Sequence, residues 1–310
     1  MKPLRIGSRG SALALWQSNH IRIRLAELHG VESEIVRIHT SGDHFQGATI
    51  SQIGMKGIFI KELEDALLSG AIDLAVHSMK DVPTEIPGGL AFPAISKRED
   101  VRDCVISHRC VNLDKLPAGS RVGTSSLRRQ AQLLFLRPDV QPVELRGNVD
   151  TRIKKVAAGE YYAIILAKAG VDRLGMSEKI TQVLPTSSML PAVGQGALGI
   201  ETREDDRETS VLVAGLNDEA TRTCVTAERS LLRELEGGCQ VPLGAWARLG
   251  AAGLLLEACV LSPDGKEHLR REQSGAPEEA EKIGKRLGQV LLEAGADRIL
   301  RLAGRGVGNG

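Results

Sequence analysis

Short apolar runs alternate with amphipathic segments over the first two-thirds of the chain, and this alternation limits the possible folds more than any other feature. Residues 4–8 (LRIGS), 33–39 (SEIVRIH) and 72–78 (IDLAVHS) are typical of short strands. Segments that begin near residues 11 and 57 carry apolar side chains at helical spacing. Strands and helices that alternate in this way predict an α/β fold.

The same order of elements recurs between residues 104 and 190. The predicted strands and helices there are, in order, 120–125, 126–136, 141–147, 149–159 and 162–167. Local stretches also resemble each other, such as GAIDLAVHS and GEYYAIILA, each with a glycine before an apolar run. Two similar α/β domains explain this likeness better than one long sheet, although such patterns also recur by chance in α/β proteins.

The last third of the chain has a different pattern. A helix is predicted at 218–235, followed by three strands and a closing helix; these four elements are 244–250, 254–262, 267–275 and 277–295. Pro263-Asp264-Gly265 is a turn signal between the last two strands, and Pro277 suits the first turn of a helix. This part of the chain is predicted to be an α+β module with a three-stranded sheet.

Composition excludes several function classes. A chain of 310 residues is too long for one ordinary core, so two or three domains are expected. The net charge is only +1 and aromatic residues make up 3%, which disfavours nucleic acid and membrane surfaces as partners. Arginine nevertheless outnumbers lysine, and its planar fork suits carboxylate and phosphate groups. This combination favours a small polyanionic ligand.

The compartment is inferred from the cysteines and the N-terminus. Five cysteines are scattered without a CxxC pair, which argues against a disulfide framework. A signal peptide would need an uninterrupted apolar segment near the N-terminus, and Arg5 and Arg9 interrupt that segment here. No apolar segment of the sequence is long enough to span a membrane. We expect a cytoplasmic protein.

Hydroxyl and cationic side chains follow the predicted strands. Ligands of α/β sheets bind beyond the carboxyl ends of strands, where hydroxyls cap helices and free N–H groups attract anions. The candidates are Arg9, Ser11, Ser78, Lys80, Asp81, Thr124, Ser125, Ser126, Arg128, Arg129, Arg146, Asn148, Arg152, Lys168 and Arg173. Two such faces across a cleft would form a deep anion site.

Each of these candidates also has a simpler interpretation. Ser11 and Ser125 could be helix N-caps, and Arg146 could be a surface charge on a loop. Arg128 and Arg129 stand near a helix start, where they oppose the helix dipole; an anion in front of that helix would account for them, and so would solvation. The anion site is favoured because the pattern recurs at several strand ends.

Asp81 and His77 lie at the end of one predicted strand. A carboxylate among cations can stabilise a transient positive charge or transfer a proton, or it can form an ion pair with Lys80 or an arginine. From the residues alone, the ion pair is the favoured interpretation. His77 lies within the apolar run and is expected to be a core histidine.

Cys239 follows Gly237-Gly238 at the end of the predicted helix 218–235, with no histidine or second cysteine nearby in sequence. It could be an inert small side chain, a nucleophile, or a covalent attachment point to which the glycines give a bulky group access. Cys104 and Cys259 lie in apolar runs and are expected in the core.

Seven stretches together resemble the porphobilinogen deaminase family, also called hydroxymethylbilane synthase. They are SRGSALALWQ, GMKGIFIKELE, AVHSMKDVP, GTSSLRRQ, LRGNVDTR, LPAVGQGA and LEGGCQVPLGA, in the order of the family and within residues 4–300. The resemblance implies three domains, of which two are lobes like those of type II periplasmic binding proteins. Domain 1 would comprise 1–97 and 197–215, domain 2 would comprise 101–192, and domain 3 would comprise 219–310.

The resemblance also implies an activity. Members of the family join four porphobilinogen molecules head to tail, release ammonia and produce hydroxymethylbilane for haem biosynthesis. Their dipyrromethane cofactor is held by a thioether, which by motif position would form at Cys239. Asp81 matches the catalytic aspartate of the family. It would assist loss of ammonia and stabilise positive charge on pyrrole nitrogens.

Further positions follow from the same motifs. The residues expected to bind the cofactor are Ser78, Lys80, Thr124, Ser125, Ser126, Arg128, Arg129, Arg146 and Gly147. The residues expected to contact the substrate are Arg9, Ser11, Arg152, Arg173, Gln195, Lys56 and Phe59. No metal, nucleic acid or membrane partner is implied, and a monomer is expected.

Two other functions are compatible with parts of this pattern. A non-catalytic anion-binding protein built from the same two lobes is the alternative, and the third domain with its GGC sequence counts against it. A hydrolase with Cys239 as nucleophile is disfavoured because no partner histidine can be recognised.

Overall fold

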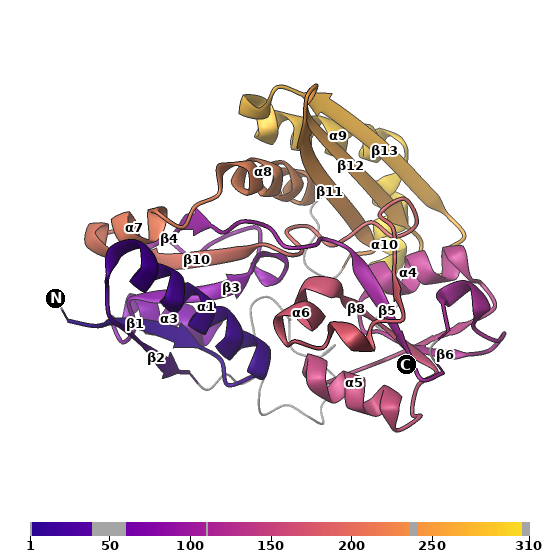
Figure 1. Cartoon of the computed structure of the whole chain (residues 1–310). Coiled ribbons are helices and arrows are strands. Elements are labelled where there is room, and N and C mark those ends of the chain that lie inside the picture. The colour runs from indigo at the N-terminus through magenta and orange to yellow at the C-terminus, as the bar shows by residue number, and fades with distance from the viewer. Residues whose placement is uncertain (1, 39–59, 110, 236–240, 306–310) are drawn as a thin grey trace. The chain divides into compact units, whose positions relative to one another are not determined.

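The computed structural model describes residues 2–38, 60–109, 111–235 and 241–305 (Figure 1). The chain forms two compact units. The first unit is Met1–Glu99 with Gly196–Arg222, and the second unit is Asp100–Gln195 with Thr223–Gly310. No helix in the described ranges is both long and apolar enough to cross a membrane.

The first unit contains a mixed five-stranded sheet in the order β2-β1-β3-β10-β4. β1 runs parallel to β2 and β3, whereas β10 runs antiparallel to β3 and β4. The strands are β1 Leu4–Ser8, β2 Ser33–Arg37, β3 Leu74–Ser78, β4 Leu90–Ile95 and β10 Leu198–Arg203. The chain therefore returns to this sheet after it has built the second lobe.

Helices cover both faces of the first sheet. Ile21 and Leu25 of α1 (Ala12–His29) and Val213 of α7 (Arg207–Ala214) pack into one apolar cluster with side chains of the sheet. Leu63 and Leu67 of α3 (Lys61–Leu68) belong to a second cluster on the other face. Because both faces are covered, the central strands are mostly apolar, and two polar side chains within them, His77 on β3 and Glu201 on β10, are buried against each other.

The second unit repeats this sheet in the order β7-β6-β8-β5-β9. β6 runs parallel to β7 and β8, and β5 runs antiparallel to β8 and β9. The strands are β5 Asp103–Ser107, β6 Arg121–Gly123, β7 Gln141–Val143, β8 Ala163–Ala167 and β9 Gln182–Val183. Each strand has a counterpart in the first sheet, which confirms the prediction of two similar α/β lobes.

This second sheet is also covered on both faces. Leu133 of α4 (Leu127–Leu136) packs on the face formed by Val105 and Ile165. On the opposite face, α5 (Val149–Ala157) and α6 (Lys168–Arg173) pack against the alternate strand residues. The alternation of side chains along each strand thus supplies two separate cores.

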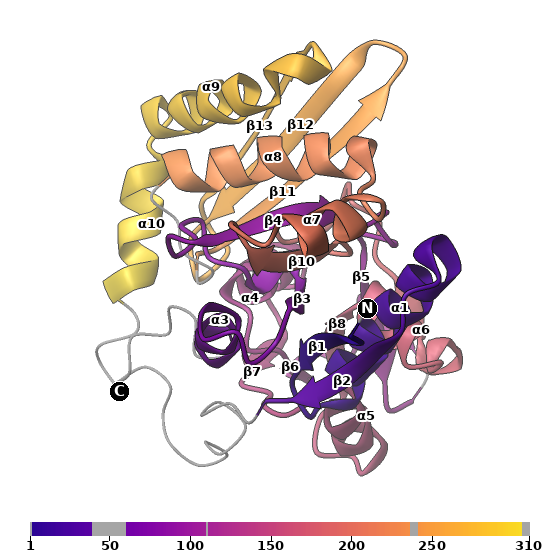
Figure 2. The ribbon, with the colours of Figure 1, turned by 90° about the vertical axis from the view of Figure 1, so that its left-hand side faces the viewer.

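The C-terminal part of the second unit is a three-stranded antiparallel sheet with helices against it (Figure 2). Its elements are α8 Glu219–Glu234, β11 Leu243–Gly250, β12 Gly253–Leu261, β13 His268–Gly275, α9 Ala280–Glu293 and α10 Ala296–Arg305. Side chains from α8, α9 and α10 share one apolar cluster with β11 and β12. The predicted α+β module with a three-stranded sheet is confirmed.

Residues 190 and 191 join this module to the second lobe. Gln132 of α4 donates to the carbonyl of Leu190 (3.0 Å) and accepts from the Leu190 N–H (2.8 Å). The next carbonyl, that of Pro191, accepts from the N–H of Ala245 in β11 (2.9 Å). Lobe and module therefore belong to one compact unit. The three domain boundaries expected from the resemblance stay a prediction.

The predicted strand 141–147 is longer than the strand in the structure. β7 ends at Val143, and it lies at the edge of its sheet, where Pro142 is tolerated. Beyond it, the backbone N–H and C=O of Leu145 bond to the hydroxyl of Ser125 (3.2 and 2.6 Å). A side chain therefore replaces the neighbouring strand as hydrogen-bonding partner at this point.

The contact between α8 and α9 generates a prediction about stability. A Cβ on Gly284 would lie 2.3 Å from the backbone oxygen of Ala227. Gly284→Ala is therefore expected to lower the free energy of unfolding by about 1–3 kcal/mol or more, because overpacking outweighs the roughly 1 kcal/mol gain in helix propensity. Denaturant titration measures this change.

Gly250→Ala is the matched control, because a Cβ there would meet nothing within 4 Å. It should change the free energy of unfolding by no more than about 0.5 kcal/mol. Equal stability of the two variants would contradict the close packing of α8 on α9.

Candidate active site

The first unit gathers polar side chains at one edge of its sheet. β1 and β3 are parallel neighbours, so both end at the same edge, at Ser8 and Ser78. Arg9 and Ser11 follow β1, and the short helix η2 (Met79–Asp81) follows β3. The structure thus brings Arg9, Ser11, Ser78, Lys80 and Asp81 to one sheet edge, although they come from two separate stretches of sequence.

Two hydroxyls at this edge support the local backbone. Ser11 is the N-cap of α1 and accepts from the N–H of Ala14 (3.3 Å), as its simpler interpretation predicted. The hydroxyl of Ser78 accepts a hydrogen bond from Gln17 (3.0 Å), whose side chain is buried. Gln17 ties α1 to the end of β3. Gln17 was not among the predicted site residues. The sequence feature that could have revealed it is an amide side chain on the apolar face of a helix.

Asp81 is exposed, on a turn whose flanking residues are buried. Met79 and Val82 are both 3% exposed, and Met79 N–H donates to the Ala197 carbonyl (3.0 Å). Over the ranges that the structure describes, no side chain forms an ion pair or hydrogen bond with the Asp81 carboxylate. The ion pair favoured from the residues alone is therefore not seen there. The turn presents this carboxylate on an anchored backbone.

His77 is a core residue, as expected. It is 5% exposed, and its Nε2 lies 3.0 Å from a carboxylate oxygen of Glu201, which is fully buried on β10. Its ring also meets Phe92 edge to face at 5.9 Å between centroids.

In the second unit, Thr124, Ser125 and Ser126 follow β6. Ser126 is the N-cap of α4, and Thr124 accepts from the Ser126 N–H (3.3 Å). Ser125 is not a cap, contrary to one of its two interpretations, because its hydroxyl is taken up by Leu145. The three residues shape the turn that leads into Arg128 and Arg129.

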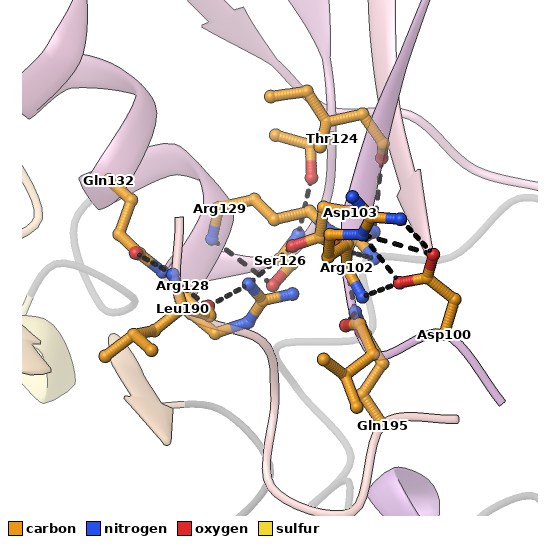
Figure 3. A network of polar contacts seen from close by, with 12 residues as sticks. Asp100, Arg102, Asp103, Thr124, Ser126, Arg128, Arg129, Gln132, Leu190 and Gln195 are labelled. Atoms are coloured by element: carbon orange, nitrogen blue, oxygen red, sulfur yellow. Dashed lines mark hydrogen bonds and ion pairs between the residues drawn. The ribbon is translucent and has the colours of Figure 1, made fainter. Parts of the chain in front are cut away.

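Arg128 and Arg129 point into the second unit and are only 4% and 6% exposed, so the interpretation as a solvated pair is wrong (Figure 3). Both donate to the fully buried carboxylate of Asp103 at the start of β5. Arg128 does so over 2.6 Å, and Arg129 over 2.8 and 3.2 Å. The helix start therefore tolerates two cations because a buried anion faces them.

Burial alone would raise the pKa of Asp103, but the charges and hydrogen bonds of the two arginines outweigh burial and hold that pKa well below its usual range. Burial lowers the pKa of Arg128, and the charge of Asp103 opposes that effect; the guanidinium stays protonated at neutral pH. The Asp103 carboxylate stabilises the fold above its unfolded pKa of about 3.9, and this contribution is lost as the pH falls further.

Gln195 belongs to the same cluster. Its side chain is 1% exposed and donates to the Asp103 carboxylate (3.0 Å) and to the Val101 carbonyl (2.7 Å). The structure thus brings together Gln195, Arg128 and Arg129, three predicted site residues that are far apart in sequence. Asp103, which joins them, was not among the predicted residues.

The remaining basic candidates lie after β7 and on α5 and α6. Arg146 pairs with Glu144 (2.8 Å) and keeps 31% side-chain exposure. Gly147 has a φ of +110°, which disfavours any side chain there, and its carbonyl accepts from Arg152 (2.6 Å). Arg173, at the end of α6, is 8% exposed. Lys56, Phe59 and Cys239 lie outside the described residues.

Two of the cysteines are poor nucleophiles. Burial raises the pKa of the Cys104 thiol to about 12 and that of Cys259 to about 11. Because the thiolate is the reactive form, neither suits covalent chemistry at neutral pH. Both lie in the core, as expected.

Solved structures of low similarity include a methionine binding protein, MetQ, and a periplasmic substrate-binding protein from Coxiella burnetii. They are 14% and 13% identical to this chain with TM-scores of 0.44 each, and they cover 69% and 73% of it, over 89% and 96% of their own lengths. Similarity this low does not identify the family of the chain.

Sequence comparison is more specific. The family model described as porphobilinogen deaminase, dipyromethane cofactor binding domain, matches residues 4–211, and the model of the C-terminal domain matches 222–293. A porphobilinogen deaminase of Syntrophobacter fumaroxidans is 49% identical over 96% of both chains. One of Geotalea uraniireducens is 48% identical over 97% of this chain and 94% of its own. With this similarity along nearly its whole length, the chain belongs to the porphobilinogen deaminase family.

Proposed function

We propose that this enzyme joins four molecules of porphobilinogen head to tail, with release of ammonia, and hydrolyses the product to hydroxymethylbilane. The proposal rests on one observation: in a chain of this family, cationic and hydroxyl side chains gather where the strands of both lobes end. Porphobilinogen carries an acetate and a propionate, so every coupling adds two carboxylates. Guanidinium groups are suited to them, since each can bind a carboxylate with two hydrogen bonds.

Asp81 is proposed as the catalytic residue. Its exposed carboxylate stands on a turn fixed by buried neighbours, which suits a group that must keep its place through repeated couplings. A negative charge there stabilises the positive charge that develops on a pyrrole ring as ammonia leaves. The adjacent Lys80 and the nearby Arg9 would bind carboxylates of the substrate.

The second lobe fits a dipyrromethane group with carboxylate side chains. Thr124 and Ser126 would supply hydroxyls, and Arg128, Arg129 and Arg146 would supply cations. Ser125 would act through the turn, because its hydroxyl is bonded to the backbone of Leu145. The buried Nε of Arg128 has no hydrogen-bond partner among the described residues, so Arg128 can donate one more hydrogen bond to a ligand. When bound, the cofactor supplies the free pyrrole carbon to which the first substrate molecule is joined.

Cys239 is proposed as the attachment residue. Gly237 and Gly238 before it leave the backbone accessible to a bulky ring. A thioether needs no neighbouring base when the carbon that reacts with the thiol is strongly electrophilic, so the absence of a nearby histidine in sequence is no obstacle. Cys104 and Cys259 are buried and protonated, which leaves them unsuited to the role.

We also infer that the enzyme works in the cytoplasm as a monomer. Cys104 and Cys259 are buried as free thiols, which is typical of a reducing compartment. The non-catalytic alternative finds no support, since the related proteins that share nearly the whole chain are deaminases.

The covalent attachment is testable by intact-mass spectrometry. Protein purified from cells able to make porphobilinogen is expected to be heavier than the bare polypeptide by two pyrrole units. Cys239→Ala should abolish both the added mass and the activity. Cys259→Ala, which removes a buried thiol, should keep the added mass. A parent protein of bare polypeptide mass would contradict the proposal.

The role of Asp81 is testable by kinetics. Asp81→Asn keeps the size of the side chain but removes its charge, so it should retain the added mass while kcat falls at least about 100-fold, as when one charge-stabilising group is lost elsewhere. The control is Asp205→Asn, an exposed aspartate beyond β10, at the opposite edge of the same sheet. It should stay within about twofold of the parent. An Asp81→Asn enzyme that turns over near the parent rate would show that the assigned role is wrong.

A further inference from the structure

One carboxylate in the second unit holds together three side chains that the proposed function assigns to ligand binding (Figure 3). Asp103 is 0% exposed and accepts four hydrogen bonds from side chains. One comes from Arg128, two from Arg129 and one from Gln195. Asp103 itself belongs to neither the predicted catalytic nor the predicted binding residues.

Each of the three donors is also fixed by a backbone carbonyl. Arg128 donates to Leu190 (2.7 Å), Arg129 to Ile165 (3.1 Å) and Gln195 to Val101 (2.7 Å). These carbonyls come from three different segments of the second unit. Asp103 is the common partner through which the orientation of one donor constrains the other two.

The charges of the cluster do not cancel. Two guanidinium groups face one carboxylate, so the cluster carries one excess positive charge in a buried environment. Uncompensated buried charge is unfavourable, and the buried Arg128 Nε offers a further N–H without a partner in the described ranges. A single carboxylate group of a ligand would satisfy both the charge and the donor.

We propose that Asp103 is a positioning residue: it orients Arg128, Arg129 and Gln195 for a ligand carboxylate and leaves the cluster one positive charge with which to bind it. This inference rests on the proposed function. The inference goes beyond the proposed function because it assigns the specificity for an anionic group to Asp103, a residue that does not itself touch the ligand.

A simpler role for Asp103 would be to neutralise two buried cations and so to stabilise the fold. The two roles differ in what matters about the side chain. Stability through neutralisation needs only the negative charge, whereas positioning also needs the carboxylate oxygens in their present place. Asp103→Glu keeps the charge and displaces the oxygens by one methylene group, so it separates the two roles.

The experiment compares the parent with Asp103→Glu, Asp103→Asn and Asp100→Asn. Asp100 is the matched control, because it lies three residues away and pairs with Arg102 and Lys168 at 22% exposure, outside the cluster. For each folded variant, one measures KM and kcat for porphobilinogen, the unfolding midpoint, and the fraction of molecules that carry the added mass.

Positioning predicts that Asp103→Glu loses carboxylate binding while the chemical step survives. We expect KM to rise about 10-fold or the mass-carrying fraction to fall below half, with kcat of the mass-carrying protein within about threefold, because the lost contact serves ground and transition states alike. Asp103→Asn should have at least the same effect. If it does not fold, the decision rests on Asp103→Glu, and Asp100→Asn should match the parent.

A folded Asp103→Glu variant with parental KM and parental added mass would overturn the inference, whatever its unfolding midpoint, because charge alone would then suffice. A parent that consumes no porphobilinogen would contradict the proposed function instead. The two failures are therefore distinguishable.

Discussion

Burial of both faces of each five-stranded sheet is the constraint on which the rest of the structure depends. Strands such as β3 and β8 lie between helices, so most of their interior side chains are apolar. A polar side chain within such a strand needs a buried partner, as His77 and Glu201 have in each other, and the other polar side chains gather where a strand stops. Parallel neighbours stop at the same edge. The requirement to cover two faces thus concentrates hydroxyls and charges at one edge of each lobe.

Asp103 is a buried charged side chain that depends on its partners. It occupies the first position of β5 and is fully buried, yet its carboxylate is satisfied by groups from α4 and from Gln195. Such a cluster contributes less to net stability than its short distances suggest, because desolvation offsets the attraction between charges. Its value lies in fixing geometry at the start of a helix, where unopposed cations would be unfavourable.

The sequence predicted the elements with strong local signals. The strand 4–8, the helix that begins near Ser11 and the helix after Ser126 agree with β1, α1 and α4, and the two similar lobes and the three-stranded sheet are confirmed. The inward direction of Arg128 and Arg129 could not be predicted, since Asp103 stands 25 and 26 residues away in the sequence. The roles of the site residues remain predictions.

β10 has a consequence for the order in which the protein can form. It is the strand between β3 and β4, yet it is translated about a hundred residues after them, so the first sheet cannot be completed until residue 203 has left the ribosome. The second lobe has all its strands between Asp103 and Val183 and meets no such delay. During synthesis, the lobe that begins later can therefore mature earlier, while the nascent N-terminal strands wait for their missing neighbour.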